Sequence, residues 1–257
     1  MRMRLGGFAV ALVLVLGACG SDGGPEAGAP TPARPTLPSG DLTSVRDTLP
    51  PPPVDGADLT VLVTHPSGVA DPGLDALVGA LAQRPDLRVV VVAPGEAASQ
   101  VTTMSGFPAL ASPGTAADAI AAALAGPAAD ADLVVVGIEV RAGVGGPPGD
   151  AGAAVAHGLP ALVVAVEAAD APDHAAAALQ LLEVLDLELD QLLGDPPAVH
   201  RLAVPSCRDG MLRGRLALAP AAAAEPEIRS DCASTAVAPE TEAEAFAAGW
   251  ATLTRLP

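Results

Sequence analysis

Four short apolar runs, separated by alanine-rich stretches with helical spacing, most strongly limit the folds open to this chain. The runs are Leu59–Thr64, Leu87–Ala93, Asp132–Ile138 and Ala161–Val166. Their nearly continuous valine, leucine and isoleucine is typical of strands buried on both faces of a sheet. The helical stretches are Pro72–Gln83, Ala116–Ala125, Gly149–His157 and His174–Leu193. This alternation predicts an α/β fold with a mostly parallel sheet between two helical layers.

Ligands in sheets of this kind bind at the carboxyl ends of the strands. These ends are Thr64–Gly68, Ala93–Gln100, Gly137–Gly146 and Val166–Asp170. Asp71 suits the cap of the first helix, and proline at position 72 suits its first turn. The remainder of the chain predicts a strand over Val199–Pro205, an irregular stretch to about Thr241, and then an acidic turn and a last strand.

The amino-terminal part reads as a targeting segment and a tether. Residues 1–18 combine two arginines with a short apolar run, as in a secretory leader, and "LGAC" ending at Cys19 has the form of a bacterial lipobox. A plain secretory signal is the alternative. Residues 19–57 are rich in proline, glycine and small polar residues, a composition typical of a disordered tether. We therefore expect Cys19 to carry lipid and to hold a domain of residues 58–257 at the extracytoplasmic face of a bacterial cell membrane.

Cysteine content and charge add two expectations. Outside the cytoplasm, Cys207 and Cys232 are predicted to form a disulfide, with two free thiols as the alternative. The formal net charge is −17 for 257 residues, and such a surface repels nucleic acid. Nucleic acid is therefore not an expected partner.

Seven collinear motifs of residues 58–257 resemble the SurE family, whose members are metal-dependent nucleotidases. They are "VLVTHPSGVADPGLDALVGAL", "VVVVAPGEAASQ", "PGTAADAI", "DLVVVGIEVRAG", "HGLPALVVAV", "RLAVP" and "AFAAGWATLT". The resemblance implies a SurE-like, Rossmann-like three-layer sandwich with a small irregular or β carboxyl-terminal extension. It also implies a phosphatase or nucleotidase ancestry.

The resemblance fails at the family's metal centre. Carried over by position, the family's two adjacent aspartates become Pro66 and Ser67, its serine is retained as Ser99, and its asparagine becomes Glu139. His65 stands in place of the asparagine of the first loop. Magnesium and manganese favour oxygen ligands that include carboxylates, so the loss of both aspartates should weaken such a site severely. The remaining candidate metal ligands are Ser67, Ser99, Glu139 and His65, and no catalytic residue can be assigned.

Two functions remain open from the sequence. In the first, the anchored domain is catalytically impaired and acts as a binding or interaction module, with a small-molecule or protein ligand at the strand ends and no cofactor. In the second, a rebuilt site holds magnesium, manganese or zinc, and the protein is a phosphatase or 5'-nucleotidase acting on nucleoside monophosphates or small phosphate esters.

The remaining residues that could belong to a functional site give weaker signals. Asp118 is as well explained as a helix-cap partner, and His157, His174 and His200 are expected at the surface or at helix ends.

Overall fold

A computed structural model describes residues 58–146, 148–221, 228–237 and 239–257. The expected lipid-bearing Cys19, the leader and the tether lie outside these residues. Within the described residues, nine strands form one sheet in the order β3-β4-β2-β1-β5-β6-β7-β9-β8. β1, β2, β4, β5, β6 and β7 run parallel, and β3 pairs antiparallel with β4 as β9 does with β7. The predicted mostly parallel α/β sandwich is therefore confirmed.

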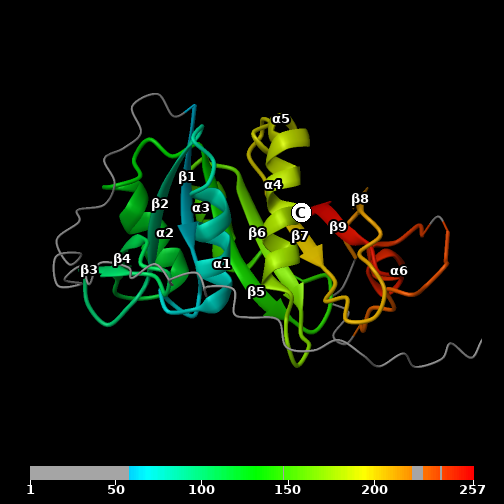
Figure 1. Cartoon of the computed structure of the whole chain (residues 1–257). Coiled ribbons are helices and arrows are strands. Elements are labelled where there is room, and N and C mark those ends of the chain that lie inside the picture. Colours follow the sequence, from blue (N-terminus) through cyan, green and yellow to red (C-terminus); the bar gives the residue numbers. More distant parts are fainter. Residues whose placement is uncertain (1–57, 147, 222–227, 238) are drawn as a thin grey trace, which may run out of the picture. The chain divides into compact units, whose positions relative to one another are not determined.

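The helices and strands follow one another along the chain as the apolar periodicity predicts, with additions near the two sheet edges (Figure 1). In order they are β1 (Leu59–Thr64), α1 (Pro72–Leu81), β2 (Leu87–Pro94), β3 (Ser99–Thr102), β4 (Pro108–Ser112), α2 (Ala116–Leu124), β5 (Leu133–Arg141), η2 (Gly149–Ala151), α3 (Gly152–Ala156), β6 (Ala161–Glu167), α4 (His174–Leu187), α5 (Leu189–Leu192), β7 (Val199–Val204), β8 (Arg215–Leu218), α6 (Glu242–Ala247) and β9 (Ala251–Arg255).

Polar side chains define the starts of the longer helices. The Asp71 carboxylate accepts a hydrogen bond from the Gly73 backbone N–H at 2.8 Å, as its position before proline predicts. Thr115 and Asp118 form a reciprocal capping box at the start of α2. Hydrogen bonds from the backbone N–H and from the hydroxyl group of Thr115 lower the pKa of Asp118. Asp118 is thus a cap partner, which accounts for it without a role in chemistry.

Each face of the sheet has its own apolar core. Alternate residues of a strand point to opposite faces, so Val61 and Val63 pack with α1 and α4, whereas Leu62 packs with α2 and α3. The interior consists largely of valine, leucine and alanine. Burial on both faces explains why the central strands are nearly continuous apolar runs. No helix of the described residues is long and apolar enough to cross a membrane.

The structure differs from the sequence expectations mainly near the sheet edges. The hairpin of β3 and β4 and the edge strand β8 were not predicted, and the expected acidic turn is the helix α6. The expected helix over His174–Leu193 is interrupted, because Glu188 leaves helical geometry with φ −131°. The expected disulfide is present: Cys207 and Cys232 are joined across a sequence separation of 25 residues.

The expected surface position of His200 is wrong. His157 caps the end of α3 and His174 begins α4, but His200 lies in β7 with only 3% of its surface exposed. Among the described residues neither ring nitrogen of His200 has a hydrogen-bond partner. Burial lowers the pKa of His200 below its usual value of 6.5, Arg255 lowers it further, and Glu188 acts in the opposite direction.

This buried histidine should make the folded state less stable at mildly acidic pH. As the pH falls through about 6.5 the unfolded chain takes up a proton at His200 before the folded chain does, so the free energy of unfolding decreases. This contribution has a slope of at most about 1.4 kcal/mol per pH unit and ends below the lowered pKa of the folded state. Urea unfolding at pH 7.5, 6.5 and 5.5 should show a smaller decrease for His200→Leu than for the wild type. Equal decreases would contradict the assignment.

Candidate functional site

The loop that follows β1 is held in place by its histidine. His65 is buried, and its Nδ1 lies 3.1 Å from the backbone nitrogen of Ser67, from which it accepts a hydrogen bond. Its Nε2 lies 3.2 Å from the carbonyl oxygen of Ile138 and 3.4 Å from the Asp71 carboxylate. A ring nitrogen that accepts from Ser67 has no proton, so the proton is on Nε2 and is donated toward β5. Both ring nitrogens of His65 are therefore engaged within the chain.

Two glycines bring neighbouring strand ends into close backbone contact at this loop. A Cβ at Gly73, near the start of α1, would lie 2.1 Å from the carbonyl oxygen of Ile138. A Cβ at Gly68, whose φ is +91°, would lie 2.9 Å from the carbonyl oxygen of Pro94 at the end of β2. The ends of β1, β2 and β5 therefore meet around the His65 loop, at the carboxyl edge where ligands bind in such folds.

Gly73→Ala should disrupt this junction. The added methyl group would overlap the Ile138 carbonyl, and relief of the overlap would displace α1 from β5, so we expect a loss of roughly 1–3 kcal/mol of unfolding free energy. Gly79 lies in the same helix with no atom within 4 Å of an added Cβ. Gly79→Ala is therefore the matched control, expected to stabilise by roughly 0.4–1 kcal/mol. Urea unfolding of both variants tests the difference, and an unchanged Gly73→Ala variant would show that the junction is loosely packed.

Glu139 and Ser99 are each engaged elsewhere. The half-buried Glu139 carboxylate accepts from Arg141 Nη1 at 3.2 Å, two residues along β5. Ser99 is exposed at the start of β3, and its hydroxyl donates to the Ala97 carbonyl oxygen at 3.3 Å. It borders a hollow of about 430 Å³ between the β3 edge of the sheet and α2, and none of the other candidate metal ligands lines this hollow.

These donors do not fit a magnesium or manganese ion. Pro66 and Ser67 are exposed and carry no charge, and both nitrogens of His65 are already bonded. That leaves Glu139, shared with Arg141, as the single carboxylate among the candidates. Within the described residues, no three histidine, cysteine, aspartate or glutamate side chains are grouped so that they could hold a metal ion.

A buried carboxylate that the sequence analysis did not single out lies at the end of β6. Glu167 is 6% exposed, and its carboxylate accepts from the backbone N–H groups of Ser206 and Ser230 at 3.0 and 2.9 Å and from the Ser230 hydroxyl at 2.6 Å. Ser206 directly precedes Cys207 in the chain, and Ser230 lies two residues before its disulfide partner Cys232. One signal was available, because Glu167 is an acid directly after six apolar residues of a buried strand.

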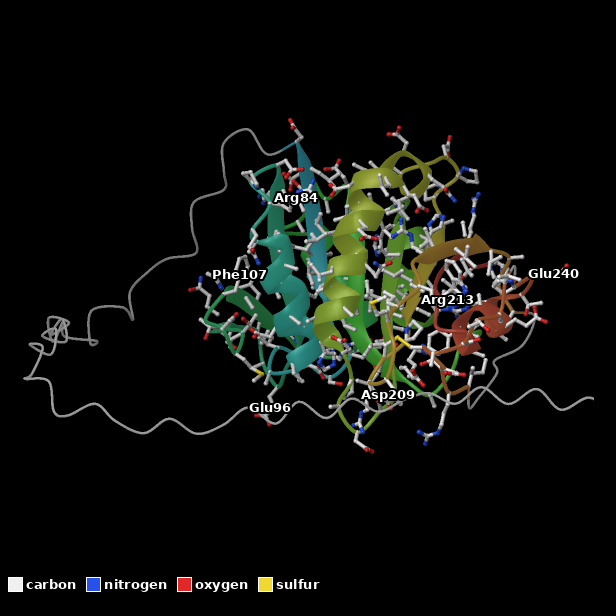
Figure 2. The ribbon with its side chains drawn as sticks, turned by 45° about the vertical axis from the view of Figure 1, so that its right-hand side comes forward. Arg84, Glu96, Phe107, Asp209, Arg213 and Glu240 are labelled. Atoms are coloured by element: carbon white, nitrogen blue, oxygen red, sulfur yellow. A yellow bond between two sulfur atoms is a disulfide. The ribbon has the colours of Figure 1, made fainter. Side chains whose placement is uncertain are left out.

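The disulfide and Glu167 border a second hollow, of about 280 Å³, at the carboxyl ends of β6 and β7. In Figure 2, Asp209, which lines this hollow, and Glu96, which follows β2, lie at one end of the domain. Arg84, which precedes β2, lies at the opposite end. Acidic side chains outnumber the two arginines that line it. The hollow is therefore a poor site for a phosphate group.

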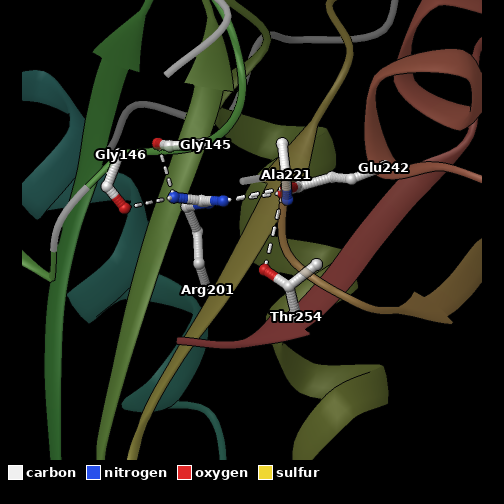
Figure 3. Close-up of polar contacts among 6 residues, drawn as sticks. All are labelled: Gly145, Gly146, Arg201, Ala221, Glu242 and Thr254. Carbon is white, nitrogen blue, oxygen red and sulfur yellow. Dashed lines mark hydrogen bonds and ion pairs between the residues drawn. The ribbon is translucent and has the colours of Figure 1, made fainter. Parts of the chain in front are cut away.

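A second buried charge network ties the glycine-rich loop that follows β5, residues 143–146, to the carboxyl-terminal segment (Figure 3). Arg201 of β7 is 2% exposed and donates from Nη1 to the Gly145 carbonyl oxygen at 2.6 Å. Its Nη2 lies 2.8 and 3.0 Å from the carboxylate oxygens of Glu242, which is fully buried at the start of α6. The same carboxylate accepts from the Ala221 backbone N–H at 2.8 Å and from the Thr254 hydroxyl at 3.4 Å. The glycine-rich loop is thus fastened to β7 and α6.

Comparison with known proteins supports the fold. The SurE protein from Aquifex aeolicus has a similar structure, with a TM-score of 0.58 and 18% sequence identity over 77% of this chain and 92% of that one. No protein-family profile matches the sequence, and no curated protein matches it. The chain therefore has a SurE-like fold, and at this level of identity the likeness extends to the architecture alone.

Proposed function

We propose that this protein is a lipid-anchored, extracytoplasmic binding module whose SurE-like domain is catalytically impaired and does not hydrolyse phosphate esters. The observation that carries the proposal is the state of the loop after β1. Its histidine is bonded through both ring nitrogens, and its two following residues, Pro66 and Ser67, carry no charge. In the SurE resemblance these are the positions of the metal-binding aspartates.

The missing carboxylates matter because the metal supplies most of the chemistry in such hydrolases. A divalent ion lowers the pKa of the attacking water and stabilises the charge on the phosphoryl group. Here Glu139 is shared with Arg141, whose guanidinium competes with a cation for the carboxylate. The carboxylate that this loop does contain, Asp71, is engaged by the Gly73 N–H at 2.8 Å and lies 3.4 Å from the His65 ring.

The SurE-like scaffold still offers a place for a ligand. The strand carboxyl ends carry the His65 loop, the Glu167 hollow and the loop held by Arg201, and each is braced by hydrogen bonds to distant segments. Braced loops at this edge suit recognition of a small molecule or a protein without chemistry. The net charge of −17 argues against nucleic acid as that ligand. Cys19 would anchor the protein, and the tether of residues 19–57 would hold the folded domain away from the membrane surface.

An active metal-dependent phosphatase or 5'-nucleotidase is the second candidate. It is favoured by the position of Glu139, which directly follows Ile138, the residue whose carbonyl accepts from His65. A carboxylate and an imidazole therefore lie on neighbouring strand ends. In this case Glu139, with Ser67, Ser99 and His65, would hold magnesium, manganese or zinc, and the ion would activate water.

Hydrolysis assays separate the two functions. The full-length protein is incubated with nucleoside monophosphates and with a generic phosphate ester, in the presence of magnesium, manganese or zinc. We expect phosphate release no faster than in metal-containing buffer without protein, because the carboxylate pair that would position the ion is absent. Metal-dependent release that disappears in Glu139→Ala would establish the phosphatase instead. Calorimetric titration with each metal is the independent readout.

A further inference from the structure

The hairpin edge of the sheet presents unpaired backbone groups. β3 is the terminal strand and pairs with β4 from Ser99 opposite Ala111 to Thr102 opposite Pro108. The Thr103 N–H donates to the Phe107 carbonyl oxygen at 2.9 Å, which makes this a hydrogen-bonded pair. Such pairs alternate along an antiparallel ladder, so Val101 and Ser99 also face β4.

It follows that Gln100 and Thr102 direct their backbone N–H and C=O groups away from β4. Within the described residues no hydrogen bond to these outward groups is present. The strand SQVT also lacks charge and proline, the features that commonly protect an edge strand from further pairing. The edge can therefore accept another extended segment.

An apolar hollow of about 430 Å³ adjoins this edge on the α2 face of the sheet. Leu110 and Val92 form its floor, because both pack on the α2 side, and Gln100 lies at its β3 rim. The wall is the carboxyl-terminal half of α2 and the residues after it, including the exposed Ala122. Most lining residues are small, so the hollow suits short aliphatic side chains.

The β3–β4 hairpin is held in place by contacts within the domain before any partner binds. At its tip, the backbone N–H and the hydroxyl of Ser105 both donate to the Asp75 carboxylate of α1 at 2.8 Å. Burial raises the pKa of Asp75, but the hydrogen bonds from Ser105 and Thr103 together outweigh burial, so the pKa is lowered overall. The carboxylate therefore stays ionised at neutral pH. A fixed edge loses little conformational entropy when a partner strand is added.

Charge selects the kind of partner. The hollow is lined by no ionisable side chain, whereas Asp118 lies one helical turn before Ala122, and Glu96 lies shortly before β3. Arg88 reaches the Pro127 carbonyl at 3.1 Å but is paired with Asp130. In a chain of net charge −17, a second copy is repelled and a basic segment is attracted.

The geometry points to β3 as a docking strand for an extended, basic peptide segment of another protein, which adds to the sheet and places small aliphatic side chains in the adjoining hollow. This inference rests on the proposed binding role, and it adds a second surface with its own partner class at the lateral β3 edge of the sheet. It is separable from that role, because the hollow contains none of His65, Ser67 or Glu139.

Hydrogen exchange on the full-length protein tests the docking mode directly. The probe is a heptapeptide that alternates valine with serine or threonine and carries arginine at both ends. Strand addition should slow exchange at the amides of Gln100 and Thr102 by about tenfold or more, since each gains a hydrogen bond. The amides of Ser99 and Val101, already bonded to β4, should be unchanged. The same peptide with alternate backbone nitrogens methylated should give no protection.

Two variants with matched controls locate the site. Gln100→Pro removes the outward N–H without removing a ladder bond, and Ala122→Leu fills the hollow from an exposed helix position. Each should weaken peptide binding by about tenfold or more. Gln100→Thr keeps the N–H, and Ala125→Leu changes an exposed alanine outside the hollow. Both controls should bind like the wild type.

The inference is overturned if the peptide protects no β3 amide or binds Gln100→Pro as well as wild type. It is also overturned if light scattering shows a dimer that Gln100→Pro dissolves, because the edge is then occupied by a second copy. Hydrolysis measured on the same preparation keeps the two proposals apart. If the peptide does not bind and no hydrolysis is seen, only the docking-strand inference is contradicted. If the peptide binds and metal-dependent hydrolysis is seen, only the proposed catalytic impairment is contradicted.

Discussion

Glu242→Ala should be among the most destabilising single changes in this protein, with a loss of roughly 3–5 kcal/mol of unfolding free energy. The variant leaves the Arg201 guanidinium buried without its carboxylate and leaves the Ala221 N–H without its acceptor. An uncompensated buried charge is costly because the protein interior solvates it poorly. Urea unfolding monitored by the fluorescence of Trp250, the single tryptophan of the chain, measures the loss.

Two further variants make this expectation specific. Glu240→Ala removes an acid that is exposed and only two residues away, so its effect should remain within about 0.5 kcal/mol. The double variant Arg201→Met with Glu242→Leu removes both charges together and should recover part of the loss, since the unpaired buried charge is then absent. A loss below 1 kcal/mol, on the order of one net hydrogen bond, in Glu242→Ala would show that water or another group reaches Arg201.

Removal of the Cys207–Cys232 disulfide is the second change with a large expected effect. The bond closes a loop with a sequence separation of 25 residues, and the entropy that it removes from the unfolded chain corresponds to roughly 3 kcal/mol of stability. The double variant Cys207→Ser with Cys232→Ser should therefore unfold at lower urea concentration. Wild-type protein kept in a reducing agent should match it, and the agent should leave the variant unaffected.

The same variant should keep its folded carboxyl-terminal segment at low denaturant. Glu167 still accepts hydrogen bonds from Ser206 and Ser230, which lie beside the two former cysteines. Near-ultraviolet circular dichroism of the double variant should therefore remain native-like. A triple variant that adds Glu167→Ala to the two cysteine changes also loses the Glu167 contacts. Its near-ultraviolet signal should therefore be abolished. A native-like signal in this triple variant would show that other contacts hold the segment.

Local pattern was sufficient for the central part of the fold. β1, α1 and β6 follow from apolar runs and helical spacing, because a strand buried on both faces must be apolar at nearly every position. The Asp71 cap and the Thr115–Asp118 capping box follow from short-range chemistry as well. By contrast, β3 and β8 are short edge strands of four residues whose mixed composition has no clear period.

The candidate site was predictable only in part. The strand ends that form it were expected, and so was the lack of aspartates at positions 66 and 67. The engagement of His65 was not, since its partner Ile138 lies 73 residues away. Ser99 was expected beside the other candidates, yet it borders a hollow that none of them lines, because the chain turns into the unpredicted hairpin directly after β2.

The sequence by itself determined the parallel α/β architecture, the order of its central elements and the absence of charge at positions 66 and 67 after β1. Burial and backbone geometry impose these features through residues that are close together in the chain. Only the tertiary structure decided that His65 is bonded at both nitrogens, that Arg201 is matched by Glu242, and that β3 is left as an open edge. Each of these depends on which distant segments meet, and that choice is made by the packing of the whole domain.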